Sequence, residues 1–189
     1  MVADVQRAEV GEPDGLERLW TPHRMAYISG ESRPDDSYEQ PDGCPFCTAP
    51  KDREAGRHIV ARGERVYALL NLYPYNPGHL LVCPYRHVAD YTDLDDAETA
   101  ELAAFTRTAM RVVRHASSPH GFNIGMNQGA VAGAGIAAHL HQHVVPRWGG
   151  DGNFMPVIAR TKVLPQLLGD TRDLLVKAWA ELARGDEPQ

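Results

Sequence analysis

The sequence predicts an α+β domain with an antiparallel sheet. Short apolar runs joined by short links come first in the chain, and a long amphipathic helix separates them from two further strand candidates. The chain has 189 residues, of which 43% are hydrophobic and 23% are charged. These values are typical of one globular domain with its own core.

Three strand candidates lie in the first half of the chain. Residues 57–61 and 65–70 flank Gly63 and Glu64, which fit a hairpin turn. Residues 79–83 are mostly apolar, and we expect Pro84 to end this strand because proline cannot donate a hydrogen bond to a neighbouring strand.

Two amphipathic helices are expected. Asp95 is a suitable N-cap for the first, and Glu98 follows it in capping-box spacing. The apolar stripe of this helix is formed by Leu102, Phe105, Ala109, Val112 and Ala116. The second helix ends at Gly185, and its stripe is formed by Leu164, Leu167, Leu168, Leu174, Leu175, Ala178 and Leu182.

Two more strand candidates follow the first helix. One is the segment GFNIGMN over residues 121–127, and the other is HLHQHVV over residues 139–145, which Pro146 is expected to close. The Gly/Ala-rich segment between them is expected to form a loop.

We expect three regions along the chain: an N-terminal arm with a mobile loop over residues 1–43, the main domain over 44–160, and a C-terminal helical extension over 161–189. The first region is rich in turn-forming and acidic residues. Apolar residues within 16–28 are expected to dock the arm on the main domain.

Composition argues against several classes of protein. The net charge of −6 does not suit a broad basic surface that binds nucleic-acid polymers. The N-terminal segment has no apolar run, and no stretch approaches the length of about 18 apolar residues that a membrane span requires, so neither a signal peptide nor a membrane contact is expected. Three cysteines do not form a disulfide framework, which favours the reducing cytoplasm.

Three alternating histidines are the main chemical feature. Side chains alternate between the two faces of a strand, so His139, His141 and His143 are expected to point to one side. A surface strand with incidental histidines is the alternative. Three imidazoles in register favour a metal site or nucleophilic and acid–base chemistry on phosphate.

The residues before the histidines favour phosphate. Gly129, Gly133 and Gly135 lie in a loop that can turn backbone N–H groups toward an anion, and Asn127 and Gln128 add neutral donors. A neutral imidazole nitrogen is a competent nucleophile when the proton on the other nitrogen is held.

The chain resembles the histidine triad superfamily over residues 44–147. The segment HLHQHVV matches the His-x-His-x-His-x-x signature, NLYPYNPGHLLVCP resembles the upstream strand-loop-strand, and GFNIGMNQGAVAGAG resembles the phosphate loop. The longer motifs, with WGGDGNFMP and LWTPHRM, look most like the actinobacterial diadenosine tetraphosphate phosphorylase branch. The resemblance implies a five-stranded sheet on a long helix and a homodimer that binds nucleotides.

The resemblance also implies roles for individual residues. His141 would attack the α-phosphorus of a dinucleoside polyphosphate and form a nucleotidyl-histidine, which phosphate or water then releases. His143 would contact phosphate oxygens or assist the leaving group, and His79 would steady the nucleophile strand. The expected nucleotide contacts are Asn71, Asn127, Gln128, Gly133, Ala134, Gly135, Phe46, Leu69, Leu72 and Trp148. Core packing is the alternative role for Phe46 and Leu69, and Trp148 could simply pack.

Two positions depart from the pattern of the superfamily. Many relatives carry a Ser or Gln shortly before the triad, whereas residues 133–138 here contain no hydroxyl or amide side chain. Backbone N–H groups, His143 and Asn127 or Gln128 must then hold the phosphate. Gln142 occupies a normally apolar position and is expected to face away from the triad.

Cys44 and Cys47 form a C-x2-C, which is half of a tetrahedral zinc site. There is no second C-x2-C, so two histidines must complete such a site, from the candidates His58, His79, His87, His115, His120 and His139. The resemblance selects His87 and His139 and implies a structural zinc ion, with no organic cofactor. A redox-labile or merely structural cysteine pair is the alternative, and Cys83 is expected to be a small buried hydrophobe.

Other functions use the same features. A nucleoside phosphoramidate hydrolase would need the same histidines with a different leaving group. A non-catalytic nucleotide-binding module would have no need of the middle histidine, and a zinc-stabilised interaction domain would not be stabilised by AMP.

Overall fold

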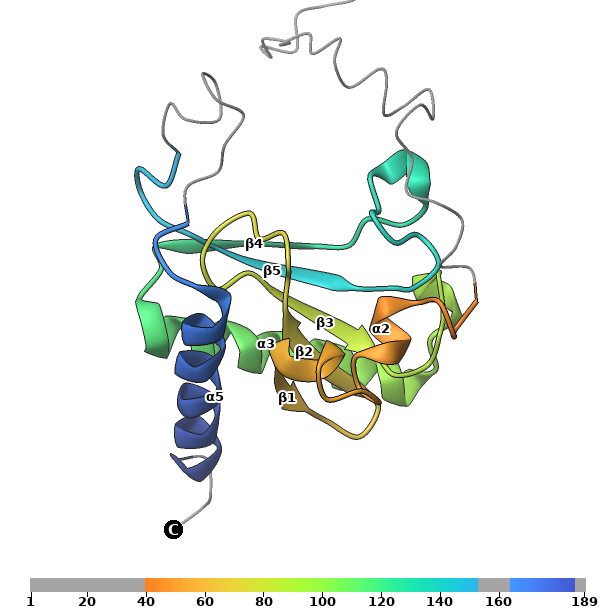
Figure 1. The fold of residues 1–189 in the computed structure, drawn as a ribbon, viewed down its shortest axis with the longest axis horizontal. Helices are drawn as coiled ribbons and strands as arrows, with labels where there is room; N and C mark the ends of the chain where they lie inside the picture. The colour runs from red at the N-terminus through yellow and green to blue at the C-terminus, as the bar shows by residue number, and fades with distance from the viewer. Residues whose placement is uncertain (1–39, 153–163, 186–189) are drawn as a thin grey trace, which may run out of the picture. The chain divides into compact units, whose positions relative to one another are not determined.

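The computed structural model describes residues 40–152 and 164–185, which form a five-stranded antiparallel sheet in the order β1-β2-β3-β5-β4 (Figure 1). The strands are β1 (Ile59–Arg62), β2 (Val66–Leu70), β3 (Leu80–Pro84), β4 (Gly121–Gly125) and β5 (Gln142–Arg147). The predicted α+β class is therefore confirmed. Most of the predicted arm over 1–43 lies outside the described residues, as does the docking segment 16–28, and the three-region division stays a prediction.

The central strands are covered on both faces. Every residue of β2 and β3 is buried, which explains why these strands read as continuous apolar runs and not as alternating ones. Their alternate residues still separate, because Val66, Ala68 and Leu70 join one core cluster while Tyr67 and Leu69 join another.

All five strands differ from their predicted bounds: β2 begins at Val66, one residue late, and β4 already ends at Gly125. Strand β1 begins at Ile59 because the 3₁₀ helix η2 (Ala55–His58) precedes it. Strand β3 begins one residue later than expected and includes Pro84, whereas β5 begins only at Gln142 and continues through Pro146 to Arg147.

Pro84 and Pro146 are tolerated within strands because their backbone N and O atoms face side chains and not a neighbouring strand. The carbonyl oxygen of Pro84 accepts from His139 Nε2 at 3.0 Å, and that of Pro146 accepts from Asn76 Nδ2 at 2.9 Å. The N and O atoms of a strand residue point the same way, so each missing N–H faces a side chain and removes no ladder bond.

Helix α3 (Asp96–Ser117) confirms the predicted capping box, in which Asp95 and Glu98 each accept a hydrogen bond from the other's backbone N–H. Its stripe packs on the sheet together with α5 (Leu168–Gly185). Helix α5 begins later than expected, and Leu164 and the exposed Leu167 precede it. The short helices α2 (Pro45–Thr48), η3 (Tyr91–Asp93) and η4 (Ala130–Ala132) complete the described elements.

The two faces of the sheet are packed differently. The face under α3 and α5 is an aliphatic cluster that includes Leu80, Val112 and Val144. The other face, under α2, holds a cluster of cysteines, aromatic residues and Leu81. No helix among residues 40–152 and 164–185 is long and apolar enough to cross a membrane.

Candidate active site and metal centre

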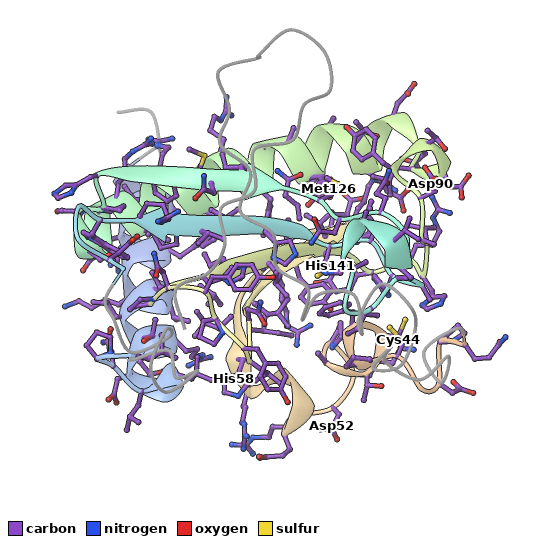
Figure 2. All side chains as sticks on the ribbon, turned by 90° about the horizontal axis from the view of Figure 1, so that it is seen from above. Cys44, Asp52, His58, Asp90, Met126 and His141 are labelled. Atoms are coloured by element: carbon purple, nitrogen blue, oxygen red, sulfur yellow. The ribbon has the colours of Figure 1, made fainter. Side chains whose placement is uncertain are left out.

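Four histidines gather on the face of the sheet that lies away from α3. Figure 2 shows His141 and Cys44 on this side. His79 and His139 are fully buried and His141 is nearly so, whereas His143 is half-buried. His139 and His141 lie in the segment just before β5, and His143 lies within that strand.

Backbone contact fixes the tautomer of His141. Its Nδ1 lies 2.8 Å from the carbonyl oxygen of His139, and a carbonyl can only accept, so the ring proton is on Nδ1. The lone pair is then on Nε2. Burial lowers the pKa of His141, which favours the neutral form that a nucleophile requires.

His79 and His143 form a hydrogen-bonded pair, and this pair places an N–H, not a lone pair, at Nε2 of His143. The backbone N–H of Tyr75 donates to His79 Nδ1 at 3.1 Å, so the proton of a neutral His79 is on Nε2. This Nε2 lies 2.9 Å from His143 Nδ1, which must accept. The proton of His143 is therefore on Nε2.

Both His79 and His143 are neutral at pH 7. Burial, followed by the neighbouring histidines, lowers the pKa of His79 to about 3. Burial, followed by His141, lowers the pKa of His143 to about 4. The ring centroids of His141 and His143 lie 5.0 Å apart, so a ring with a lone pair on Nε2 neighbours a ring with an N–H at Nε2. This arrangement can attack a phosphorus atom and donate to one of its oxygens.

Several predicted nucleotide contacts lie near the histidines. The Phe46 ring is 5.0 Å from that of His141, and Leu69 belongs to the same buried cluster as Phe46. Asn71 Nδ2 is 3.4 Å from His79 Nδ1, and Leu72 is 53% exposed. Asn127 lines a cavity together with His143.

The predicted phosphate loop contains the backbone turns that glycine permits. Gly129 and Gly133 have positive φ angles of 77° and 89°, which other residues rarely adopt. The N–H of Ala134 lies 3.5 Å from the carbonyl oxygen of Gly129, and Gly135 follows at the surface. The phosphate contacts of this loop stay a prediction.

Two predicted contacts lie away from the histidines. Gln128 Oε1 accepts from the Tyr91 N–H at 2.6 Å and lines a cavity beside α3, together with Gln142. Gln142 thus faces away from the triad, as expected. Trp148 donates from Nε1 to the Ser117 carbonyl and lines a different cavity, against α5. The structure does not bring Gln128 or Trp148 to the reacting histidines.

A cavity of about 410 Å³ adjoins His143, and most of its lining was not expected to be functional. It is lined by Tyr75, Asn76, Asn123, Ile124, Gly125, Asn127, His143, Val145 and Arg147. The Tyr75 ring stacks on that of His143 at 5.9 Å. Strand alternation could have identified Arg147, because it continues the period of two that starts at His141.

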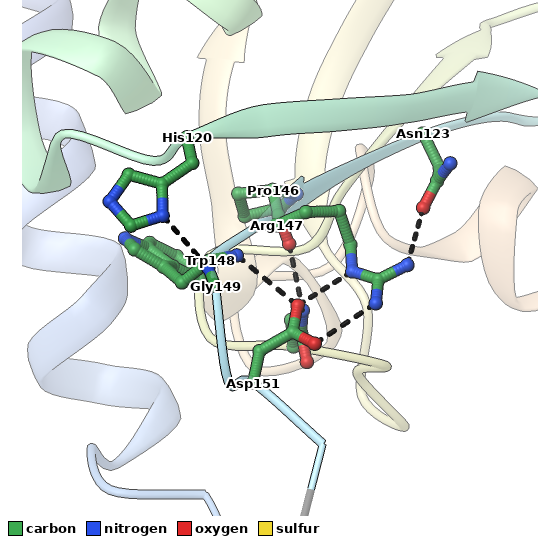
Figure 3. A network of polar contacts seen from close by, with 8 residues as sticks. His120, Asn123, Pro146, Arg147, Trp148, Gly149 and Asp151 are labelled. Carbon is green, nitrogen blue, oxygen red and sulfur yellow. Dashed lines mark hydrogen bonds and ion pairs between the residues drawn. The ribbon is translucent and has the colours of Figure 1, made fainter.

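A polar network holds the far end of this cavity (Figure 3). Arg147 pairs with Asp151 through Nε at 2.6 Å and Nη2 at 2.9 Å, and its Nη1 donates to Asn123 at 2.7 Å. Asp151 also accepts from Asn76 Nδ2 at 2.7 Å and from the Trp148 N–H at 3.2 Å. These contacts hold the pKa of Asp151 well below its usual range, with the Arg147 bond as the largest cause.

Cys44, Cys47, His87 and His139 form a cluster whose ligand atoms all lie within 4.8 Å of one another. His139 Nδ1 lies 3.4 Å from each sulfur, and Cys47 Sγ lies 3.3 Å from His87 Nδ1. Zinc bonds of about 2.3 Å to sulfur and 2.0 Å to nitrogen give tetrahedral S···N edges of about 3.6 Å. The donor set therefore fits a metal ion.

The tautomer of His139 also suits a metal ligand. Its Nε2–H donates to the Pro84 carbonyl oxygen, which leaves a lone pair on Nδ1 facing the sulfurs. Burial raises the pKa of Cys47 to about 11. The other four histidine candidates lie elsewhere. His79 pairs with His143, and His115 contacts Glu181. His120 accepts from the Gly149 N–H, and His58 lies by Arg57.

These features agree with comparisons to known proteins. The HIT domain model matches residues 52–150, and the chain belongs to the HIT family. The resemblance seen in the sequence is confirmed.

The relatives include enzymes that are named for dinucleoside polyphosphates. The chain is 54% identical to an AP-4-A phosphorylase of Mycobacterium tuberculosis over 172 residues, which are 90% of this chain and 88% of the relative. It is 35% identical to an asymmetrical bis(5'-nucleosyl)-tetraphosphatase of Schizosaccharomyces pombe over 49% of this chain and 50% of the relative. A Zn-bound histidine triad family protein of Mycobacterium smegmatis superposes with a TM-score of 0.64 at 28% identity, covering 78% of this chain and 100% of that chain.

Proposed function

We propose that this chain cleaves dinucleoside polyphosphates, such as diadenosine tetraphosphate, at the α-phosphate through a nucleotidyl-histidine. The observation that carries the proposal is the pair of opposite tautomers in neighbouring rings: His141 has a lone pair on Nε2, and His143 has an N–H at Nε2. The names of the Mycobacterium tuberculosis and Schizosaccharomyces pombe relatives support the same substrate class.

In the first step, His141 Nε2 forms a bond to the α-phosphorus. The bond from that phosphorus to the oxygen bridging to the β-phosphate breaks, and its electron pair leaves with the released nucleoside polyphosphate. His141 becomes an imidazolium, which its Nδ1–H bond to the His139 carbonyl oxygen stabilises. The Nε2–H of His143 donates to the bridging oxygen as negative charge develops there.

In the second step, an oxygen of phosphate or water attacks the phosphorus of the nucleotidyl-histidine. The N–P bond breaks and returns its electron pair to His141 Nε2, while the proton of the acceptor passes to solvent. With diadenosine tetraphosphate, phosphorolysis yields ADP and ATP, whereas hydrolysis yields AMP and ATP. Product analysis with and without phosphate distinguishes the two reactions. Cleavage of a phosphoramidate without cleavage of diadenosine tetraphosphate would contradict the proposal.

The decisive variant is His141→Asn. It removes the nucleophile, and we expect kcat to fall about 10⁴-fold or more while AMP still binds. His115→Asn is the matched control, because His115 lies on α3 and contacts Glu181 rather than the site. Near-normal turnover by the His141 variant would overturn the proposed mechanism.

We further propose that Cys44, Cys47, His87 and His139 hold a structural zinc ion. Four protein ligands leave no open position for substrate, and His139 would anchor the segment that carries His141. The Zn-bound histidine triad family protein supports this choice of metal. We expect about one zinc per chain by elemental analysis of protein purified without chelators, and a loss of zinc in Cys44→Ser. A content below about 0.2 per chain would contradict the proposal. The expected homodimer stays a prediction.

A further inference from the structure

We propose that the cavity beside His143 binds the leaving nucleoside polyphosphate, and that Arg147 contacts its distal phosphates. Arg147 would thereby select substrates with a long phosphate chain over mononucleotides. This inference rests on the proposed function and adds to it a binding site for the half of the substrate that departs.

The two neighbours of His141 define two sides of the reaction. Phe46, whose ring contacts that of His141, lies on one side, where the proposed function places the nucleoside that is transferred. His143 lies on the other side and donates to the oxygen that leaves. The cavity includes His143 in its lining but not His141 or Phe46, so it begins beyond the reacting nitrogen, where the leaving half of the substrate would continue.

The strand places Arg147 at a distance from the bond that breaks. His143, Val145 and Arg147 all line the cavity from β5. Arg147 follows His143 by four positions, which is about 13 Å of extended strand. The guanidinium therefore suits phosphates further along the chain, or the second nucleotide, and not the phosphate that His141 attacks.

Arg147 is held in one position by its partners. Three of its five N–H donors are used by the two oxygens of Asp151 and by Asn123. Among the described residues no further bond to the guanidinium is found, so two N–H groups are available to an anion. A guanidinium that is already oriented loses little freedom when it binds phosphate.

The rest of the described lining is neutral. Asn76, Asn123 and Asn127 contribute amides, and the low pKa of His143 leaves it uncharged at pH 7. Arg147 is therefore the permanent positive charge among the described residues of this cavity. Asp151 pairs with this charge but does not line the cavity, so the two remaining N–H donors of Arg147 favour a polyanion over a ligand that ends at the α-phosphate.

The experiment measures binding in the inactive His141→Asn background, so that it does not depend on turnover. We expect Arg147→Gln to weaken the binding of diadenosine tetraphosphate about tenfold or more and to change the binding of AMP less than about twofold. Arg147→Lys, which keeps the charge, should recover part of the affinity.

Asp151→Asn is the matched structural control. It weakens the same network but keeps the arginine charge, so we expect it to retain or increase the affinity for diadenosine tetraphosphate. Equal losses for both ligands, equal losses in the Asp151 and Arg147 variants, or no loss in either would overturn the inference. Turnover of diadenosine tetraphosphate by the unmodified chain tests the proposed function separately, because its absence would leave the comparison of affinities readable.

Discussion

The two faces of the sheet use the same strands for different purposes. On the helix-covered face, Leu80 and Val144 pack with residues of α3 and α5 in an aliphatic cluster. On the opposite face, Leu81, next to Leu80, belongs to the cluster of cysteines and aromatic residues, and His143, next to Val144, lies against other histidines. One face is specified by the shapes of side chains, and the other is specified by hydrogen-bond partners.

This difference decides what a substitution should change. An aliphatic cluster loses packing and transfer free energy when a side chain is shortened, wherever the chemistry lies. On the histidine face, backbone groups assign a proton to one nitrogen of each ring, as the Tyr75 N–H does for His79. Substitutions there should therefore change protonation and chemistry as well as stability.

The largest stability effect is expected on the helix-covered face. Leu80 is fully buried between the sheet and the helices, so Leu80→Ala should lower the free energy of unfolding by about 3 kcal/mol. The exposed Leu167 is the matched control, and Leu167→Ala should change it by less than about 0.5 kcal/mol. Denaturant unfolding measures both variants. If Leu80→Ala reduced turnover as strongly as His141→Asn while leaving stability intact, the separation of the two faces would be wrong.

Much of this architecture was predictable from the chain because its signals are local. The capping box of Asp95 and Glu98 depends on residues three positions apart, and the confirmed helix stripe depends on a single periodicity. The helix-ward direction of Gln142 follows from strand alternation alone. Boundaries were less predictable at Pro84 and Pro146, because a proline is tolerated wherever the adjacent group is a side chain, and that is decided by distant residues.

Prediction of the site residues is limited in the same way, because contacts between distant parts of the chain decide them. The cluster of Cys44, Cys47, His87 and His139 was selected by resemblance, whereas the spacing alone left six histidines open. Tyr75 was not expected at all, because its backbone bond to His79 arises from the loop between β2 and β3. Trp148 lies against the cavity beside α5, because the turn held by Asp151 directs the chain away from the histidines.

A smaller loss of stability is expected when the pH is lowered, and it arises on the histidine face alone. The pKa of His79 is about 3 in the folded protein because of burial, against about 6.5 when unfolded, so below pH 6.5 the unfolded state binds more protons. Stability should therefore be complete above pH 6.5 and should fall as the pH decreases toward 3. His79 alone should contribute a loss of about 2 kcal/mol between pH 7 and pH 5.

The contribution of His79 is isolated by comparing how the free energy of unfolding changes with pH in the unmodified chain and in a variant. In His79→Gln, the group that titrates is gone while the candidate metal ligands are the same, so the loss of stability between pH 7 and pH 5 should be smaller than in the unmodified chain by about that amount. Unfolding free energies at the two pH values give each slope, and any general destabilisation of the variant cancels within it. Equal slopes would mean that His79 is not held neutral, and the assignment of the His143 proton to Nε2 would then lose its basis.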